Sequence, residues 1–338
     1  MSQAKVGAVA IGRNEGERLI LCLEALLASG MEVVYVDSNS SDNSVAEAKA
    51  RGVHVVELDL SKPFTAARAR NAGAQKLLEV SPDSEFLQFV DGDCELEAGW
   101  VATALAAFAD EPELVAACGR RKERFPSATP FNQLCDLEWD TPIGLADACG
   151  GDALYRRSAF EAVSGFDETL IAGEEPELCY RLREAGGKIR RLDAPMTLHD
   201  ADVHRFGQWW KRTVRSGHAA AEAWALHGSD GQTAMVRIAK SALAYGLVAP
   251  LTGLIGFGVL LALGLGKWSL IAPLATLVLF SLLISRVRAT RLELGDSPET
   301  ASLYARYTFL GKFAEMTGVL KFALGRLRGR RSTLIEYK

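Results

Sequence analysis

The fold is decided by the stretch FLQFVDGD, residues 86–93. Its first five residues are mostly apolar, which is the pattern of a buried strand, and they run straight into two carboxylates separated by a glycine. Short apolar runs of the same kind come earlier in the chain, each followed by polar or turn-forming residues, at 6–11, 33–36 and 53–58. These four runs predict buried parallel strands.

Helical patterns separate these runs. Leu19, Leu23, Leu26 and Leu27 fall on one helical face, and residues 65–78 are rich in Ala, Arg and Leu. Alternating strands and helices predict an α/β fold with an open, mostly parallel sheet. Such a sheet binds ligands at the carboxyl ends of its strands.

The polar residues that follow the predicted strands are therefore the first candidates for a functional site. Three groups would meet at one rim of the sheet: Asn14 and Glu15, then Asp37 and Asp42, then Asp91 and Asp93. The convergence of three such groups is more informative than any one of them.

The C-terminal third contains two uncharged runs, 241–266 and 268–285, separated by Lys267. Runs of about 26 and about 18 residues are long enough to cross a bilayer as helices. Basic residues flank both ends of the pair, so the positive-inside bias predicts a hairpin in an inner or plasma membrane with the N-terminal domain in the cytoplasm. A buried hairpin in a soluble core, or a shorter re-entrant insertion, is the alternative.

The predicted division has three parts. Residues 1–230 form a catalytic domain, 231–292 a transmembrane hairpin, and 293–338 an amphipathic, basic helix and tail. Ser297-Pro298-Glu299 has the features of a helix start. The basic residues at 326–331 could meet anionic lipid, or the last helix could pack on the catalytic domain instead.

Composition excludes several classes of protein. A formal net charge of -4 over 338 residues argues against nucleic acid as a partner. The six cysteines are scattered, without a Cys-x-x-Cys pair, which argues against a disulfide framework or a zinc site. No long apolar core follows a basic N-terminus, so a cleaved secretion signal is not expected.

The candidate chemistry centres on carboxylates. Asp91 and Asp93 could hold Mg²⁺ or Mn²⁺, although Asp-Gly-Asp is also common in turns. Asp37 could accept hydrogen bonds from a base or a ribose, while Asp42 could simply cap the following helix.

Two further candidates lie later in the chain. Glu174 and Glu175 could supply a general base, or they could serve only as favourable charges at a helix start. His199 could lie near the metal or be structural.

These segments, in this order, resemble glycosyltransferase family 2, whose members have the Rossmann-like GT-A fold. Residues 9–15 resemble its first nucleotide-binding strand and turn, 37–42 its D-x-S-x-D segment, 69–73 its A-R-N-x-G helix, and 91–93 its metal-binding D-x-D. The resemblance implies that Asn14, Glu15, Asp37 and Asp42 lie on the nucleotide side. It also implies that Arg68 or Arg70 approaches the donor phosphates, with Asp91 close by.

The second half of the resemblance covers the acceptor side. Residues 150–153 and 165–167 resemble the family's acceptor segments, which implies acceptor roles for Gly151 and Asp152. The stretch GEEPELCYRL, 173–182, resembles G-E-D-x-x-L-x-x-R-L, whose Asp is the usual base. Glu175 takes that position, and the choice between it and Glu174 stays open. His199 matches a late histidine that contacts metal or phosphate.

The implied reaction is inverting and metal-dependent transfer of a sugar from a nucleoside-diphosphate donor, with UDP as the first nucleotide to test. The acceptor would be lipid-linked or a saccharide, held at the membrane. Trp209 and Trp210 could stack on an acceptor sugar or lie at the membrane interface. The charged run 120–124 could approach phosphates, or it could be a solvated surface.

Three other functions remain possible at this stage. The enzyme could transfer its sugar directly to polyprenyl phosphate. A non-catalytic membrane scaffold with the same fold is argued against by the presence of Asp91, Asp93 and Glu175 together. A nucleotidyltransferase would release pyrophosphate rather than a nucleoside diphosphate.

Overall fold

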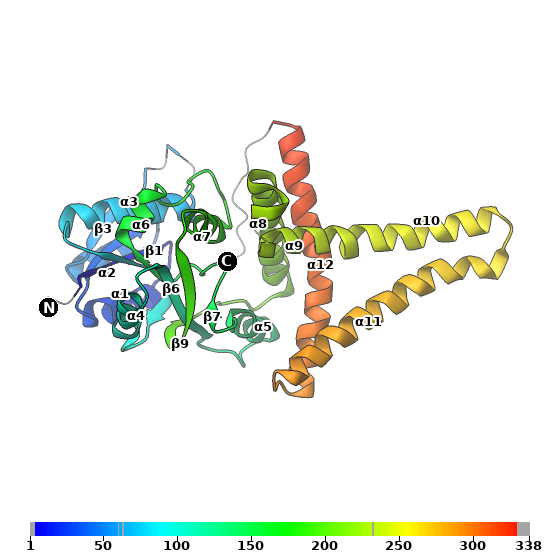
Figure 1. Cartoon of the computed structure of the whole chain (residues 1–338), viewed down its shortest axis with the longest axis horizontal. Coiled ribbons are helices and arrows are strands. Elements are labelled where there is room, and N and C mark those ends of the chain that lie inside the picture. Colours follow the sequence, from blue (N-terminus) through cyan, green and yellow to red (C-terminus); the bar gives the residue numbers. More distant parts are fainter. Residues whose placement is uncertain (1–3, 60, 63, 232, 330–338) are drawn as a thin grey trace. The chain divides into compact units, whose positions relative to one another are not determined.

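The computed structural model describes residues 4–59, 61–62, 64–231 and 233–329, and Figure 1 shows the whole chain. Contacts divide the chain into two compact units, Met1–Asp202 and Val203–Lys338. The sequence-based boundary at residue 230 therefore differs from the boundary in the structure. The reason is that α8 (Phe206–Gly231) packs along α12 (Pro298–Leu327), where a Cβ on Gly217 would lie 2.0 Å from the backbone oxygen of Glu315.

The first unit is built on one sheet, ordered β3-β2-β1-β4-β8-β6-β9-β5 in its described residues, with β7 paired to β9. One half is parallel, as the sequence predicts, and contains β1 (Val6–Gly12), β2 (Glu32–Asp37), β3 (His54–Glu57) and β4 (Phe86–Asp91). The other half is mixed: β8 (Ala153–Arg156) runs antiparallel to β4 and β6 (Leu114–Glu123), while β9 (Lys188–His199) runs parallel to β6. The short strands β5 (Cys94–Leu96) and β7 (Gly144–Leu145) are antiparallel to β9.

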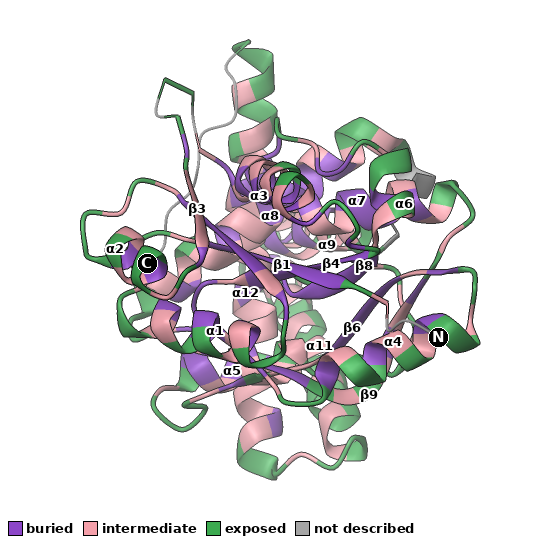
Figure 2. Cartoon of the chain, turned by 90° about the vertical axis from the view of Figure 1, so that its left-hand side faces the viewer, coloured by how far each residue is buried: buried purple, intermediate pink, exposed green. Residues whose placement is uncertain are grey.

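Helices cover this sheet. They are α1 (Glu17–Ala28), α2 (Ser44–Ala50), α3 (Ala66–Val80), α4 (Trp100–Asp110), α5 (Pro130–Trp139), α6 (Arg157–Ala162) and α7 (Glu174–Glu184). Figure 2 shows the buried residues concentrated in the central strands β1, β4 and β8. Helix α3 lies close to the sheet because Gly73 has no side chain: a Cβ there would lie 2.3 Å from Cγ1 of Val9. This close approach fixes where the arginines of α3 can point.

In the described residues of the second unit, every regular element is a helix or a helical turn. After α8 come α9 (Thr233–Leu243), a π-helical turn (Ala244–Val248), α10 (Ala249–Ala262), a 3-10 turn (Gly266–Leu270), α11 (Ile271–Glu293) and α12. Two helical stretches, Ala234–Ala262 and Gly266–Glu293, are long and apolar enough to cross a membrane. Their most apolar windows are only 11% and 0% buried. Other parts of the chain do not cover these side chains, which disfavours the alternative of a soluble core hairpin.

The last helix begins as the sequence predicts, because the Ser297 hydroxyl accepts the backbone N–H of Thr300 at 3.2 Å. Its buried positions are mostly small residues, Ala301, Ala305, Gly311, Ala314 and Gly318, whereas Leu303 and Leu310 are half-buried. Part of the predicted basic tail, residues 330–338, lies outside the described residues.

Candidate active site

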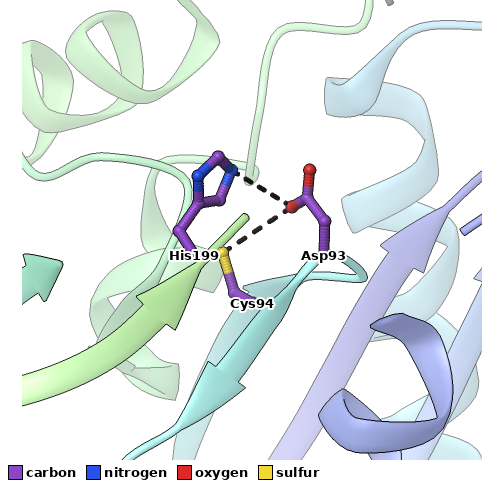
Figure 3. Close-up of side chains that lie close together, drawn as sticks. All are labelled: Asp93, Cys94 and His199. Atoms are coloured by element: carbon purple, nitrogen blue, oxygen red, sulfur yellow. Dashed lines mark hydrogen bonds and ion pairs between the residues drawn. The ribbon is translucent and has the colours of Figure 1, made fainter. Parts of the chain in front are cut away.

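A histidine and an aspartate meet at the edge of the sheet where β5 pairs with the end of β9. Residue 94 is paired with His199, so the residue before it, Asp93, lies beside the imidazole. The distance from Asp93 Oδ1 to His199 Nε2 is 3.2 Å (Figure 3). With the buried thiol of Cys94, these side chains form a group whose ligand atoms all lie within 4.8 Å of one another.

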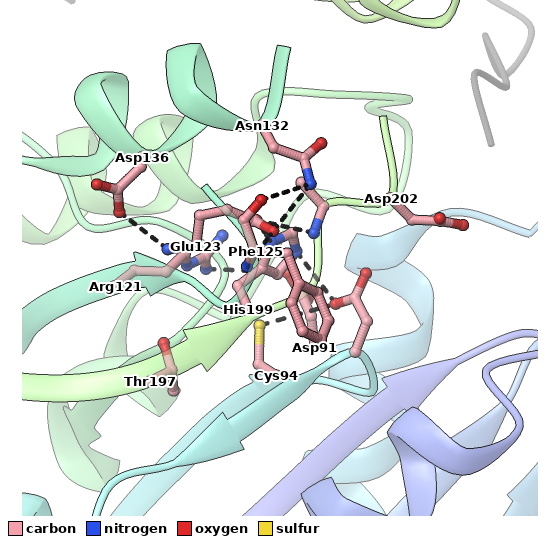
Figure 4. Close-up of polar contacts among 12 residues, drawn as sticks. Asp91, Cys94, Arg121, Glu123, Phe125, Asn132, Asp136, Thr197, His199 and Asp202 are labelled. Atoms are coloured by element: carbon pink, nitrogen blue, oxygen red, sulfur yellow. Dashed lines mark hydrogen bonds and ion pairs between the residues drawn. The ribbon is translucent and has the colours of Figure 1, made fainter. Parts of the chain in front are cut away.

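The imidazole of His199 is held from its other side. Its Nδ1 lies 3.9 Å from Oε2 of Glu123 (Figure 4). The ring of Trp139 meets the imidazole edge-on, with 4.5 Å between the ring centroids. Glu123 is itself fixed by Asn132 Nδ2 at 3.1 Å and by the Ala201 N–H at 3.0 Å. Burial disfavours the charged imidazole, but Asp93 and Glu123 outweigh it and raise the pKa of His199.

The backbone of Asp91 is held by the buried carboxylate of Asp152. Its backbone N–H donates to Oδ1 of Asp152 at 2.9 Å, and the other oxygen of Asp152 accepts from the Thr197 hydroxyl at 2.7 Å and pairs with Arg121 Nε at 3.0 Å. Asp152 is 0% exposed. The Asp152 carboxylate therefore positions the backbone of Asp91, and its acceptor role stays a prediction.

Arg70 joins the two acidic motifs. Its Nη1 donates to Glu174 Oε1 at 2.8 Å, while its Nη2 donates to Asp91 Oδ1 at 2.8 Å and lies 3.2 Å from Glu175 Oε1. Gly151 is needed next to this group, because a Cβ there would lie 2.6 Å from both Arg70 Nη2 and Asp91 Oδ2. Gly151 thus leaves the space that Arg70 and Asp91 occupy, rather than forming an exposed acceptor contact. Arg70 binds carboxylates at the position where donor phosphates were expected.

The ionisation of the cluster follows from its charges. Burial opposes ionisation of Asp91, but Arg70 and then Arg121 hold the pKa of its carboxyl below the usual range. At Glu175, burial and the neighbouring Glu174 raise the pKa to about 7, in spite of Arg70. The side chain of Glu175 is 18% exposed, whereas that of Glu174 is 4% exposed. Only Glu175 combines a raised pKa with access from solvent.

The two loops on the nucleotide side are tied to each other by local hydrogen bonds. Asn14 donates its N–H to Ser40 Oγ at 2.9 Å and accepts the Ser41 N–H at 2.7 Å. Asp42 accepts the Gly16 N–H at 3.1 Å and the Ser44 N–H at 3.0 Å, so it ties the two loops together just before α2, whose N-cap residue is Asn43. Asp37 is buried and accepts from the Tyr35 hydroxyl and the Ser40 N–H, both at 2.8 Å.

The remaining candidates on this side are more peripheral. Glu15 lies against the turn of the D-x-D motif, where a Cβ on Gly92 would come within 3.4 Å of its Cγ, and it pairs with Arg18 at 2.8 Å. Arg68 points to its own loop and donates to the carbonyls of Asp59 and Lys62 at 2.7 and 3.0 Å. Neither arrangement requires a ligand.

Sequence reasoning did not select Arg121 as a site residue, although the charged run around it was noted. The guanidinium lies over the Trp139 ring at 5.5 Å, and its Nη2 is 3.9 Å from Asp91 Oδ2. That nitrogen is buried without a hydrogen-bond partner among the described residues. Alternation along β6 was the available signal: Arg121 and Glu123 share one side of the strand and point to the site.

The two tryptophans belong to the second unit. Trp209 is buried and meets Tyr307 of α12 edge-on at 5.0 Å, so it packs helices together instead of offering a stacking surface. Trp210 is half-buried and contacts Phe206 at 5.8 Å between ring centroids.

The donor set fits a divalent cation. Asp93 supplies a hard oxygen ligand and His199 an imidazole nitrogen, a combination that suits Mn²⁺ at least as well as Mg²⁺, while Asp91 falls in a separate group with Cys94 and Asp152. Burial and nearby carboxylates raise the pKa of Cys94, which keeps its thiol neutral and makes a thiolate-bound soft metal unfavourable.

Comparisons with known proteins agree with this geometry. The model of the family "Glycosyl transferase family 2" matches residues 11–164. The pre-mycofactocin glycosyltransferase of Mycobacterium tuberculosis is 29% identical over 234 residues, which is 63% of this chain and 46% of that protein. The succinoglycan biosynthesis protein ExoA of Rhizobium meliloti is 26% identical over 75% of this chain and 82% of its own.

A solved structure shows the same fold. A mannosyltransferase from Pyrobaculum calidifontis, in complex with GDP-Man and Mn²⁺, superposes with a TM-score of 0.56 at 16% identity, over 96% of this chain and 88% of that chain. The chain spans about half the length of the first curated relatives that it matches. The sheet order and the family match together show a GT-A fold. Over residues 11–164, which lie in its N-terminal unit, the chain is thus similar to glycosyl transferase family 2.

Proposed function

We propose that this protein transfers a sugar, with inversion, from a nucleoside-diphosphate sugar to an acceptor held at a membrane. The observation that carries the proposal is the meeting of two acidic motifs around Arg70, with Asp91 on one side and Glu174 and Glu175 on the other. A group that binds the leaving diphosphate and a group that takes a proton must lie close together for such a transfer, and here one guanidinium touches both.

Glu175 is the proposed general base. A base works best when its pKa is near the working pH, and the pKa of Glu175 is raised to about 7. Its partial exposure lets an acceptor hydroxyl reach it, whereas Glu174 is buried against Arg70 and has a positioning role. Glu175 would accept the hydroxyl proton as the oxygen attacks the anomeric carbon.

Asp91, Asp93 and His199 are the proposed ligands of a divalent cation. When bound, such an ion neutralises the charge that develops on a leaving diphosphate. Asp152 and Thr197 hold the backbone of this turn in place, and Glu123 fixes the imidazole. Mn²⁺ is the first metal to test, because the set includes an imidazole nitrogen.

On the donor side, the proposal keeps the two loops around Asn14 and Asp37 as the nucleotide site. Tyr35 and Ser40 already donate to the Asp37 carboxylate, so a base or ribose would bind beside these groups or displace them. UDP-sugars are the first donors to test, followed by GDP-sugars.

The membrane acceptor is supported by the helical unit. Two helices have the length and composition to cross a bilayer, with basic residues at the ends of the hairpin and Lys267 at its tip. We expect the catalytic unit on the cytoplasmic side and a lipid-linked acceptor or saccharide in polysaccharide or glycan assembly.

A binding panel followed by a transfer assay tests the proposal. Full-length protein in detergent is melted with UDP, GDP and dTDP and their sugars, with Mn²⁺, Mg²⁺ or chelator. A metal-dependent rise in Tm with one nucleotide, lost in Asp93→Ala, is the expected result. The same nucleotide sugar should then release a nucleoside diphosphate when membrane lipid extract is added. Well-folded protein that responds to no nucleotide, or that releases pyrophosphate, would contradict the proposal.

A further inference from the structure

Arg70 holds more acidic groups than one guanidinium can neutralise. Three carboxylates, those of Asp91, Glu174 and Glu175, lie 2.8 to 3.2 Å from its nitrogens, and its side chain is only 2% exposed. Arg121, which also approaches Asp91, is closer to Asp152, at 3.0 Å against 3.9 Å. In the described structure the cluster therefore has an unbalanced negative charge.

The position of Arg70 is fixed from several sides. Its helix begins at Thr65, whose hydroxyl accepts the Arg68 N–H at 3.1 Å, and Gly73 keeps the helix close to β1. The guanidinium also lies 5.5 Å from the centre of the Phe166 ring. If the side chain left the cluster, Glu174 would lose its partner at a buried position, and Asp91 and Glu175 would lose theirs at partly exposed positions, which is costly.

We propose that Arg70 is a shared counter-ion that couples the metal ligands to the base. In the absence of metal, Arg70 balances Asp91 together with the two glutamates. A cation bound to Asp91 neutralises that carboxylate in place of Arg70. The positive charge of Arg70 is then available to Glu174 and Glu175. Metal binding thus strengthens the ion pair between Arg70 and Glu175. This inference rests on the proposed function of Glu175 as the base.

The geometry supports a link in both directions. Arg70 Nη2 is the single nitrogen that both Asp91 Oδ1 and Glu175 Oε1 approach, at 2.8 and 3.2 Å. A stronger interaction with one oxygen weakens the interaction with the other, because the two acceptors compete for the same donor. By thermodynamic reciprocity, a change at Glu175 must then change the affinity of the metal site.

A double-mutant cycle measures this coupling with Mn²⁺ alone as the probe, so that no donor or acceptor is needed. Wild type, Glu175→Gln, Arg70→Gln and the double variant are titrated by calorimetry as full-length protein in detergent. In the wild-type background, Glu175→Gln is expected to weaken Mn²⁺ binding by about tenfold, because it frees Arg70 to compete for Asp91. Without Arg70, the same change is expected to weaken it by no more than about threefold.

Equal effects of Glu175→Gln in both backgrounds would overturn the inference, since they would show that Arg70 transmits nothing. Each variant is first checked by its melting curve. If Arg70→Gln does not fold, Arg70→Lys replaces it in the cycle, because one ammonium group cannot reproduce the fork that reaches three carboxylates. Arg156→Met is the control: it changes a half-buried arginine of the same unit that donates to two backbone oxygens and contacts two aromatic rings.

The cycle separates this inference from the proposed function. Coupled Mn²⁺ affinities with no sugar transfer from any nucleotide sugar would retain the shared counter-ion and remove the assignment of Glu175 as a base. Sugar transfer with additive Mn²⁺ affinities would do the opposite.

Discussion

The loops around Asn14 and Asp37 and the cluster around Arg70 contain the same kinds of acidic residue, but the carboxylates of the two regions have different partners. Asp37 and Asp42 accept hydrogen bonds from backbone N–H groups and hydroxyls of their own loop or the neighbouring one. In the cluster, Asp91, Glu174 and Glu175 share one arginine from a distant helix. Local hydrogen bonds hold the loops in a stable conformation. In the cluster, three carboxylates share one arginine, and a bound ligand can neutralise their excess negative charge.

The largest expected effect comes from Asp93, a proposed metal ligand that lies beside His199. Asp93→Ala removes the carboxylate beside His199, and with it charge stabilisation worth several kcal/mol. Transfer is expected to fall by about a thousandfold or more. The rate is measured as nucleoside diphosphate released at saturating Mn²⁺, with Tm as the check on folding. Retention of more than a tenth of the activity would exclude Asp93 from the metal site.

Glu175→Gln is expected to have the next largest effect. The amide cannot accept a proton, so transfer falls by about a hundredfold to a thousandfold. Donor binding, followed as the nucleotide-dependent rise in Tm, stays nearly intact because the change leaves the shape of the side chain. Glu174→Gln is the matched comparison, and a greater loss of transfer in that variant would exchange the roles of the two glutamates.

The pH dependence of transfer is a further test of the cluster around Arg70. The pKa of Glu175 is raised to about 7, so a base at this position is protonated and inactive below that pH. We expect kcat/KM to fall tenfold for each pH unit below about 7 and to level off above it. An acidic limb that persists unchanged in Glu174→Gln supports this assignment. A profile that is flat between pH 5.5 and 8 would contradict it.

The smallest expected effect is in the locally bonded loops. Asp42→Ala removes two hydrogen bonds to backbone N–H groups, which costs about 1 to 3 kcal/mol of folding stability. The expected result is a Tm lower by a few degrees with unchanged Mn²⁺ affinity. A marked loss of Mn²⁺ binding would show that this loop and the cluster are not independent.

The same contrast explains what could be predicted from the sequence. The strands β1, β2, β3 and β4 and the apolar helices of the second unit follow from local patterns, and the structure confirms them. The polar residues at the strand ends also lie at the predicted rim, because the carboxyl ends of parallel strands share one edge.

The pairings inside the cluster could not be predicted in this way. Arg70 and Glu174 are 104 positions apart, and Asp91 and Asp152 are 61 apart. Only the mixed half of the sheet, through β8 and β9, brings them together, and no local pattern encodes that pairing. For this reason the local sequence around Asp152 and Arg121 does not predict their contacts with Asp91.

The burial of all six cysteines has a practical consequence. Each thiol is at most 6% exposed, so the native chain should give little background with maleimide reagents. A single cysteine in place of Lys267, at the tip of the helical hairpin, would then be the dominant reactive site. Labelling by a membrane-impermeant maleimide in intact cells would place that tip outside the membrane. Labelling only after the membrane is opened would keep it on the inner side, as in a re-entrant hairpin.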